Sequence, residues 1–288
     1  MMNLTKRRER LRAVLAGKEC VNPAPVFDSI SARIADGLGF EIGYMAGAVA
    51  SAAVLGAPDL LVITMGELAQ QVRAICRASS LSLIIDADNG YGNALNVMRT
   101  VEELESAGVS LVSIEDTALP IGMGSHKRVE RLITLEEGVG KMKAALAARQ
   151  DPSLIILGHT HAVTVGGTPE AIRRVKAYEK AGVDAIWLAD ATREGLAAVH
   201  AETRLPLLVG QPGTALGDKN FLAANGVRIA SLGHLAFLAS VKAMYETLKA
   251  VRDGKSPSDL RPTLASPELL AQVIHQPQYD EWIKNFMS

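Results

Sequence analysis

One phrase recurs along this chain and limits its fold more than any other feature. A helical segment ends in glycine and a short apolar stretch follows at once, as in "GLGFEIGYMAG" (37–47), "SAGVSLVSIED" (106–116), "KAGVDAIWLAD" (180–190) and "ANGVRIASLG" (224–233). Glycine is favoured just past a helix because it adopts positive φ without strain. Each apolar stretch is too short for a helix and too continuous for a half-exposed strand. The repeat therefore predicts helices that alternate with buried parallel strands.

Eight such strands are expected. They are predicted at residues 24–28, 41–46, 82–87, 110–115, 154–159, 184–189, 206–210 and 228–232. Amphipathic helical patterns lie between them, and "NALNVMRTVEELESAG" (93–108) is the clearest. The alternation predicts an α/β chain folded as a closed (β/α)8 TIM-type barrel with extra C-terminal helices. A doubly wound open sheet is the alternative, although no G-x-G-x-x-G motif follows the first strand.

The division of the chain follows from a change in composition near its end. Residues 1–255 are expected to form the barrel with an N-terminal helix. Residues 256–288 begin with a Pro/Ser-rich joint and continue in a helical pattern that carries Tyr279, Trp282 and Phe286. A free tail would not need these large aromatic side chains. We therefore expect this extension to pack on the barrel or on a partner subunit.

Composition excludes several classes of function. The net charge of -1 comes without a basic stripe, which argues against a nucleic-acid partner. No apolar run is long enough to span a bilayer, and the basic N-terminus lacks the apolar core of a secretory signal. A surface helix is expected there, with a transit peptide as the alternative. Cys20 and Cys76 have neither disulfide nor metal spacing, so a cytoplasmic location is expected.

Carboxylates and histidines gather at the predicted strand ends, where barrels of this class place their chemistry. These residues are Asp86 and Asp88, Glu115 and Asp116, His159 and His161, and His234. Converging carboxylates repel one another unless a cation offsets them, and hard oxygen ligands favour Mg²⁺ or Mn²⁺ over zinc. The alternative is that individual acids cap helices or pair with basic residues. The two histidines two residues apart share a strand face; they either sit on the rim or bind zinc.

The stretch "LIIDADNGYGNALNVMRTVEELESAGVSLVSIED" (83–116) resembles the isocitrate lyase and phosphoenolpyruvate mutase superfamily, as does "VFDSISARIADGLGFEIGYMAG" (26–47). The resemblance covers about residues 20–250. "GYGNALNVMRTV", "IEDTALP" and "EEGVGKMKAALAAR" are most similar to its oxaloacetate decarboxylase family. The resemblance implies a (β/α)8 barrel, magnesium, a small 2-oxo acid substrate and a homotetramer built as a dimer of dimers, often with an exchanged C-terminal helix.

The same resemblance assigns metal roles to four carboxylates. In the superfamily, a D-x-D-x-G-Y-G strand end and an I-E-D strand end build the magnesium site. Asp86 is the implied direct ligand of Mg²⁺, with Mn²⁺ as the alternative ion. Asp88, Glu115 and Asp59 are implied to hold metal-bound waters.

The resemblance also assigns the substrate pocket, and here the chain departs from the pattern. Tyr44, Gly47 and Ala48 are implied to hold the substrate carboxylate with backbone N–H groups, and His234 matches a substrate-binding histidine. The decarboxylase family has serine where Ala48 stands, and the superfamily has a carboxylate-binding arginine where "GHTHA" places His159. A neutral imidazole cannot reproduce the bidentate guanidinium clamp. The pocket is therefore expected to differ from that of the family.

The function predicted from the sequence is magnesium-dependent decarboxylation of oxaloacetate to pyruvate and CO₂, with His234 and His159 as catalytic residues. The loop at 120–131 lacks the K-[KR]-C-G-H motif of isocitrate lyases and the K-T-N-S type loop of mutases, which favours the decarboxylase. The alternatives are a C–C or P–C lyase acting on another 2-oxo or 2-hydroxy acid, a non-catalytic acid-binding barrel, and a zinc hydrolase using His159 and His161. His126 in the loop is either an acid on a closing lid or a solvated residue.

Overall fold

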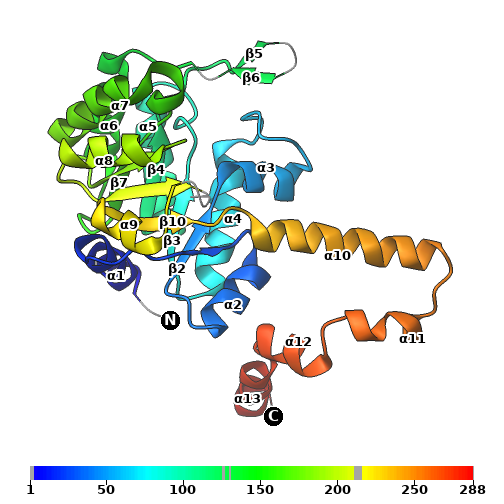
Figure 1. The fold of residues 1–288 in the computed structure, drawn as a ribbon. Coiled ribbons are helices and arrows are strands. Elements are labelled where there is room, and N and C mark those ends of the chain that lie inside the picture. The colour runs from blue at the N-terminus through cyan, green and yellow to red at the C-terminus, as the bar shows by residue number, and fades with distance from the viewer. Residues whose placement is uncertain (1–2, 125–126, 130, 211–215, 288) are drawn as a thin grey trace.

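The computed structural model describes residues 3–124, 127–129, 131–210 and 216–287, with the backbone alone at 122–124 and 127–129. Within these residues, eight parallel strands follow one another around a barrel (Figure 1). They are β1 (Ala24–Pro25), β2 (Ile42–Met45), β3 (Ser82–Asp86), β4 (Leu111–Glu115), β7 (Ile155–Thr160), β8 (Ala185–Leu188), β9 (Leu207–Gly210) and β10 (Val227–Ser231). A bridge between Val21 and Ile229 joins the two ends of the sheet. The predicted barrel is confirmed, and the open doubly wound sheet is wrong because the strand order never reverses.

Helices alternate with the strands and most of them cover the outside of the barrel, whereas the first lies at one end of it and the last extends away from it (Figure 1). They are α1 (Leu4–Ala16), α2 (Ser29–Gly37), α3 (Gly47–Leu55), α4 (Met65–Ala78), α5 (Ala94–Ala107), α6 (Leu135–Ala148), α7 (Ala162–Ala181), α8 (Arg193–Ala201), α9 (Lys219–Ala224) and α10 (Leu235–Arg252). Side-chain caps fix where several helices begin. The side-chain oxygens of Thr64, Asn93 and Thr134 accept backbone N–H groups at the starts of α4, α5 and α6. Among the described helices we find none with the length and apolar character required to cross a bilayer.

The apolar core has two layers, one inside the barrel and one between the strands and the helices. Alternate strand residues such as Ile84, Leu111 and Ile155 fill the inner layer, because successive side chains of a strand point to opposite faces. Leu11 and Leu15 of α1 belong to the same inner cluster. Helix α1 therefore closes the end of the barrel at which the strands begin.

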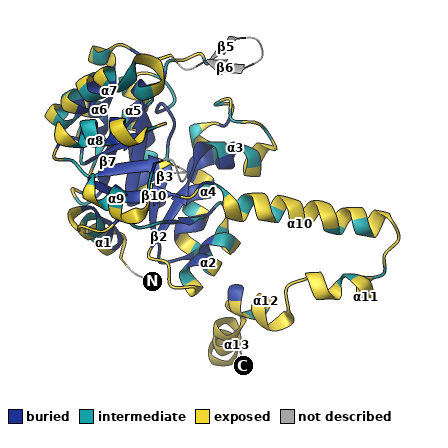
Figure 2. Ribbon diagram, in the orientation of Figure 1, coloured by how far each residue is buried: buried dark blue, intermediate teal, exposed yellow. Residues whose placement is uncertain are grey.

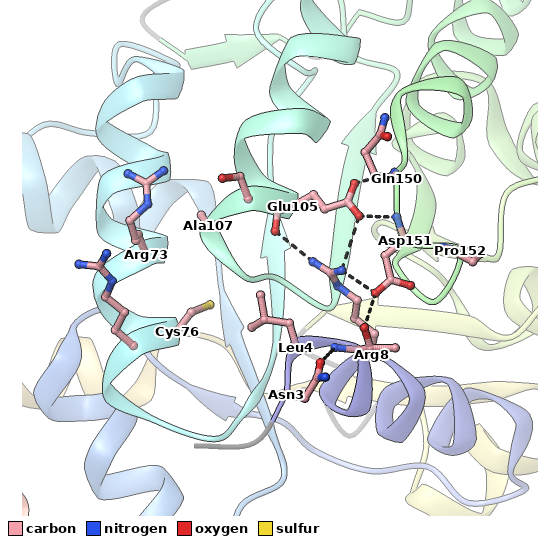
Figure 3. Close-up of a pocket in the computed structure, with 13 residues that line it drawn as sticks. Asn3, Leu4, Arg8, Arg73, Cys76, Glu105, Ala107, Gln150, Asp151 and Pro152 are labelled. Atoms are coloured by element: carbon pink, nitrogen blue, oxygen red, sulfur yellow. Dashed lines mark hydrogen bonds and ion pairs between the residues drawn. The ribbon is translucent and has the colours of Figure 1, made fainter.

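Arg8 fixes α1 to this closed end (Figure 3). Its guanidinium donates to the carbonyls of Val109 and Glu105, each at 3.0 Å, and to the carboxylate of Asp151 at 2.7 Å. Glu105 in turn accepts the backbone N–H groups of Gln150 and Asp151. Because the partners of Arg8 are all buried or half-buried, this network ties the N-terminal helix to the segments before β4 and β7.

The Asp151 carboxylate is expected to stabilise the fold in a pH-dependent way. Burial alone would raise its pKa, but hydrogen bonds from Arg8, the Ser153 N–H and Thr5 outweigh burial and lower the pKa to about 2. A depressed folded-state pKa stabilises the protein above the unfolded-state pKa, and this stabilisation is lost as pH falls toward the folded value. Asp151→Asn should lower the unfolding free energy by about 2 kcal/mol at neutral pH, and the deficit should shrink between about pH 4 and about pH 2.

Equilibrium urea unfolding of the variant and the parent at several pH values measures this effect. Asp253→Asn is the matched control, because Asp253 pairs with Lys249 at an exposed helix end and such pairs contribute little. An Asp151→Asn deficit that stays constant down to about pH 3 would contradict the assignment.

A C-terminal arm leaves the barrel after α10 (Figure 1). It comprises α11 (Pro257–Leu260), a 3₁₀ turn (Arg261–Thr263), α12 (Pro267–Val273) and α13 (Gln276–Phe286). Val273 is buried, and its carbonyl accepts a 3.5 Å hydrogen bond from Arg33 of α2, so the arm returns to the barrel wall at α12. The sequence did not predict the antiparallel pair β5 (Gly122–Gly124) and β6 (Lys127–Val129), which projects from the loop after β4.

Candidate metal and substrate site

Strand register brings the predicted site residues to one end of the barrel. Glu115 at the end of β4 pairs with His159 of β7, and His159 pairs with Trp187 of β8. These three side chains lie at the C-terminal ends of neighbouring strands, the end at which (β/α)8 barrels carry their sites. Asp86 ends β3 on the other side of Glu115. The mouth of the barrel therefore holds the side chains of Asp86, Glu115 and His159 on three successive strands of the sheet.

The turn after β3 holds its two aspartates in a fixed relation. The Asp88 N–H donates to Asp86 Oδ1 at 3.2 Å, and Asp88 has a left-handed φ of 48°, which Asp tolerates better than most residues. Gly90 follows with φ 77°, and a Cβ there would lie 2.4 Å from a methyl group of Val97. Only glycine fits that position, so the Gly-Tyr-Gly turn keeps both carboxylates at the mouth.

The start of α3 lies directly against Asp88. A Cβ on Gly47 would stand 2.5 Å from Asp88 Oδ1, so the missing side chain makes room for the carboxylate. Ala46, at the N-cap, has no side-chain group to cap the helix. The first backbone N–H groups of the helix, including those of Gly47 and Ala48, therefore receive no hydrogen bond from the side chain of the N-cap residue.

Glu115 is held by groups on both of its oxygens. Thr117 donates to Oε2 at 2.9 Å, while His161 Nε2 and His159 Nδ1 lie 3.3 Å and 3.4 Å from Oε1. His159 Nδ1 is also 4.0 Å from Asp86 Oδ1. One carboxylate oxygen of Glu115 and one ring nitrogen from each of the two histidines lie within 4.8 Å of one another. These three atoms form a cluster that could hold a metal ion.

The pKa values of Asp86 and Glu115, the two acids at the centre of the site, are shifted in opposite directions. Burial, and then the negative charges of Glu115 and Asp88, raise the pKa of Asp86 well above its ordinary value. Burial would also raise the pKa of Glu115, but charge on His159 and the hydrogen bond from His161 outweigh it and lower that pKa to about 2. Crowded acids of this kind are stabilised by a cation. The mouth therefore suits a divalent ion.

Aromatic rings form one wall of the site. The rings of His161 and His159 stack with centroids 4.9 Å apart, Trp187 lies 5.5 Å from His159, and Tyr44 stacks on Trp187 at 5.2 Å. Burial, followed by the charge of Asp86, raises the pKa of Tyr44, so its hydroxyl stays protonated. The column joins β7 and β8 to β2, and Tyr44 at one end of it lies near Asp86.

Two predicted residues stand at the edge of this group. Asp59 lies in the loop after α3, half-buried, and its charge acts on Tyr44, Asp86 and His234. His234 precedes α10 and is half-buried; burial lowers its pKa, and Asp59 partly offsets that shift. The structure thus brings Tyr44, Gly47, Asp86, Asp88, Glu115 and His159 together and leaves Asp59 and His234 beside them. His126 lies outside the described residues.

Asp116 does not belong to the mouth. It is fully buried and accepts hydrogen bonds from Thr160 at 2.7 Å, Tyr178 at 2.9 Å and Arg174 at 3.1 Å. Because it follows Glu115 directly, it points into the opposite layer, between the strands and the helices. Its role in this structure is to join β4, β7 and α7.

Sequence reasoning missed three residues that shape the site. Trp187 could have been found, since it is one of two tryptophans and lies near the end of a predicted strand. Lys141 is buried in α6 and donates to the Asn89 carbonyl at 2.9 Å, which clamps the aspartate turn. Thr117 orients Glu115 from two residues away. A lysine inside an apolar helical pattern was the available signal for Lys141.

Comparison with known proteins places the chain among relatives of nearly equal length. It is 51% identical over 273 residues to the oxaloacetate decarboxylase of Rhodopseudomonas palustris (strain BisB18), with 94% of each chain covered. It is 47% identical to the oxaloacetate decarboxylase of Bradyrhizobium sp. (strain BTAi1 / ATCC BAA-1182), with 99% of each chain covered.

Solved structures share the fold along almost the whole chain. A phosphoenolpyruvate phosphomutase from Streptomyces platensis subsp. rosaceus superposes with a TM-score of 0.87 at 26% identity, covering 98% of this chain and 99% of that one. A phosphonopyruvate hydrolase in complex with oxalate and Mg²⁺ superposes with a TM-score of 0.85 at 28% identity, with the same coverage. The sequence profile described as "Phosphoenolpyruvate phosphomutase" matches residues 11–252, and the chain belongs to this family within the isocitrate lyase and phosphoenolpyruvate mutase superfamily.

Proposed function

We propose that this protein is a divalent-metal-dependent carboxy-lyase that converts oxaloacetate to pyruvate and CO₂. The observation that carries the proposal is the convergence of Asp86, Asp88 and Glu115 at the mouth, next to the uncapped start of α3. Relatives that are about half identical over almost the full chain are oxaloacetate decarboxylases. A structural neighbour binds oxalate together with Mg²⁺, which is the pairing that a 2-oxo acid site requires.

The donor groups fit a hard cation. Asp86 is half-buried among other acids, and their negative charges, together with desolvation, raise its pKa, which is the setting that a bound cation would offset. We assign Asp86 as the direct ligand of Mg²⁺, with Mn²⁺ as the alternative, and Asp88, Glu115 and Asp59 as acceptors for its waters. A divalent cation bound there supplies Lewis-acid stabilisation of the negative charge that develops as the C–C bond breaks.

The protein's own groups bind and orient the substrate. We assign the N–H groups of Gly47 and Ala48, at the start of α3, as donors to a substrate carboxylate, helped by the helix dipole. Tyr44, kept protonated, offers an O–H donor beside them. His234 and His159 are the proposed side-chain contacts to the remaining polar groups. Loss of CO₂ requires no base, which agrees with the lack of a cysteine in the loop at 120–131.

A direct assay tests the activity. Purified protein with Mg²⁺ and oxaloacetate should release CO₂ and pyruvate in equal amounts. The alternative, a C–C or P–C lyase acting on another 2-oxo or 2-hydroxy acid, predicts no CO₂ from oxaloacetate and an acid product from a different diacid or phosphonate. A binding protein without turnover would take up oxalate in calorimetry and consume none of these compounds.

The shape of the C-terminal region supports assembly of several copies. Figure 2 shows α10 and the arm as almost wholly exposed, and no described residue of α10 is buried. Apolar side chains follow one face of α10, among them Leu238, Val241, Tyr245 and Leu248, the last of which is 69% exposed. Beside α10 lies an apolar groove of about 430 Å³, lined by Phe27, Ile34, Leu38, Phe40, Ala236 and Met244. A monomer would leave this surface in water.

The assembly that we propose is a homotetramer, a dimer of dimers, in which the arm of one copy covers the groove of another. Within it, residues 1–255 form the barrel domain and residues 256–288 the exchanged extension. A reducing cytoplasm is the proposed location, since Cys20 and Cys76 are buried free thiols. Neither a nucleic acid nor a membrane is part of the proposal.

Leu248→Glu is expected to break the assembly. A buried unpaired carboxylate costs several kcal/mol, so the dissociation constant should rise at least about 100-fold. Sedimentation velocity should show the parent protein as a tetramer and the variant as smaller species. Lys242→Gln on the same helix is the control, because Lys242 is exposed and pairs with Glu246 of the same helix. Equal sedimentation of the parent and Leu248→Glu would contradict the proposed interface.

A further inference from the structure

The two histidines of β7 and the loop after it are not explained by a magnesium site. His159 Nδ1 and His161 Nε2 face the same oxygen of Glu115, at 3.4 Å and 3.3 Å. Both Glu115 and His159 are more than nine-tenths buried, and His161 is half-buried. His159 also stands where the family resemblance leads us to expect arginine, a residue that does not ligate metal ions. The chain has therefore gathered three potential ligands around one point.

The spacing of these atoms distinguishes one class of ion from another. A tetrahedral ion with bonds of about 2.0–2.1 Å holds its donor atoms roughly 3.3 Å apart. An octahedral magnesium ion with bonds of similar length brings adjacent donors to roughly 2.9 Å. The separations of Glu115 Oε1 from His161 Nε2 and His159 Nδ1, 3.3 Å and 3.4 Å, are close to the tetrahedral value, and all three donor atoms lie within 4.8 Å of one another. Imidazole nitrogen is also a ligand that zinc and cobalt favour and magnesium avoids.

Neighbouring groups hold the three ligands in place. Thr117 occupies the second oxygen of Glu115, which leaves Oε1 directed at the imidazoles. The two rings stack at an interplanar angle of 26°, and the Trp187 ring packs against His159 with centroids 5.5 Å apart. Rotation of either ring would break this stacking. The ligands are thus oriented before an ion arrives.

We propose that Glu115, His159 and His161 form a three-ligand site for a borderline transition ion such as Zn²⁺ or Co²⁺, beside the oxygen-donor position at Asp86. Three protein ligands leave the fourth tetrahedral position open to water or substrate, as in catalytic rather than structural zinc sites. The site shares Glu115 with the proposed magnesium position, and its link to catalysis rests on the proposed function. Binding of the ion itself does not depend on that function.

Cobalt gives a readout that is independent of activity. Protein treated with a chelator should bind one Co²⁺ per chain and develop the strong visible absorption bands of four-coordinate cobalt. Zn²⁺ should abolish these bands at one equivalent, whereas a large excess of Mg²⁺ should leave them in place. X-ray absorption of the zinc-loaded protein should show the outer-shell scattering of two imidazole rings.

Variants assign the ligands. His161→Gln and His159→Arg should each weaken cobalt binding about 100-fold or more, since loss of a mere supporting group already costs 10- to 100-fold. Glu115→Gln should do the same. His275→Asn is the matched control, because His275 is an exposed imidazole with φ 57°, a conformation that Asn accepts. Circular dichroism of each variant shows whether it is folded, and a folded variant without the bands supports the assignment.

Two results would overturn the inference. One is cobalt that binds with only the faint spectrum of an octahedral oxygen site and yields readily to Mg²⁺. The other is a four-coordinate spectrum that persists unchanged in folded His161→Gln. Because oxaloacetate is absent from these measurements, a missing cobalt site would leave the decarboxylase proposal standing. Missing decarboxylase activity would equally leave a demonstrated cobalt site intact.

Discussion

Asp86→Asn is expected to lower kcat/KM for metal-dependent oxaloacetate decarboxylation by about 10³-fold, or about 4 kcal/mol in the activation barrier. The substitution keeps the shape of the side chain and can still accept the 3.2 Å hydrogen bond from Asp88 N–H. It removes the charge that binds the cation, so the metal concentration needed for half-maximal activity should rise as well. Steady-state assays over a range of Mg²⁺ and Mn²⁺ concentrations measure both effects.

Asp28→Asn is the matched control for this experiment. Asp28 also follows a barrel strand, but its side chain caps α2 by accepting the Ser31 N–H at 2.7 Å. Asparagine caps helices as well as aspartate does, so the variant should keep the parent's activity. An Asp86→Asn protein with the parent's rate and metal dependence would show that the ion binds elsewhere or that none is used.

Gly47→Ala is expected to lower kcat/KM by about 10²-fold while the barrel stays folded. The added methyl group would stand 2.5 Å from Asp88 Oδ1, so either that carboxylate or the start of α3 has to move. Both changes displace groups that are assigned to the ion or to the substrate carboxylate. The KM for oxaloacetate and the apparent affinity for the metal should therefore worsen together.

The control for Gly47→Ala is Gly140→Ala in α6. A Cβ at Gly140 meets nothing within 4 Å, and alanine favours a helix interior by up to about 1 kcal/mol over glycine. This control should match or exceed the parent in thermal stability and equal it in rate. If Gly47→Ala behaves like Gly140→Ala, the close contact between Gly47 and Asp88 has no part in catalysis.

The barrel could be predicted from the sequence because its signals are local. The glycine that follows several helices and the apolar stretch after each of these glycines depend on neighbours in the chain, and all eight predicted strands are present. Asp86 and Glu115 were placed at strand ends for the same reason. The β5–β6 pair was missed because its segment carries no alternation of apolar and polar residues.

The detailed site could not be predicted, because it depends on contacts between distant segments. Whether Glu115 turns toward Asp86 or toward two imidazoles is decided by the register of β4 on β7. The contact of Gly47 with Asp88 joins segments some forty residues apart, and the packing of Trp187 on His159 depends on the twist of the barrel. Each of these contacts is a tertiary effect, and the spacing of residues within one segment of the sequence does not reveal it.

The Arg8 network lies at the opposite end of the strands from the acids, and Val109, which it contacts, is about 20 Å of strand away from Glu115. Changes at sites this far apart have additive effects on stability. The closed end can therefore hold the barrel together while residues at the mouth are exchanged. Residues at the mouth, such as His159 and Ala48, can therefore change during evolution without loss of the contacts that stabilise the closed end. The acid or the ion that the barrel binds can change with them.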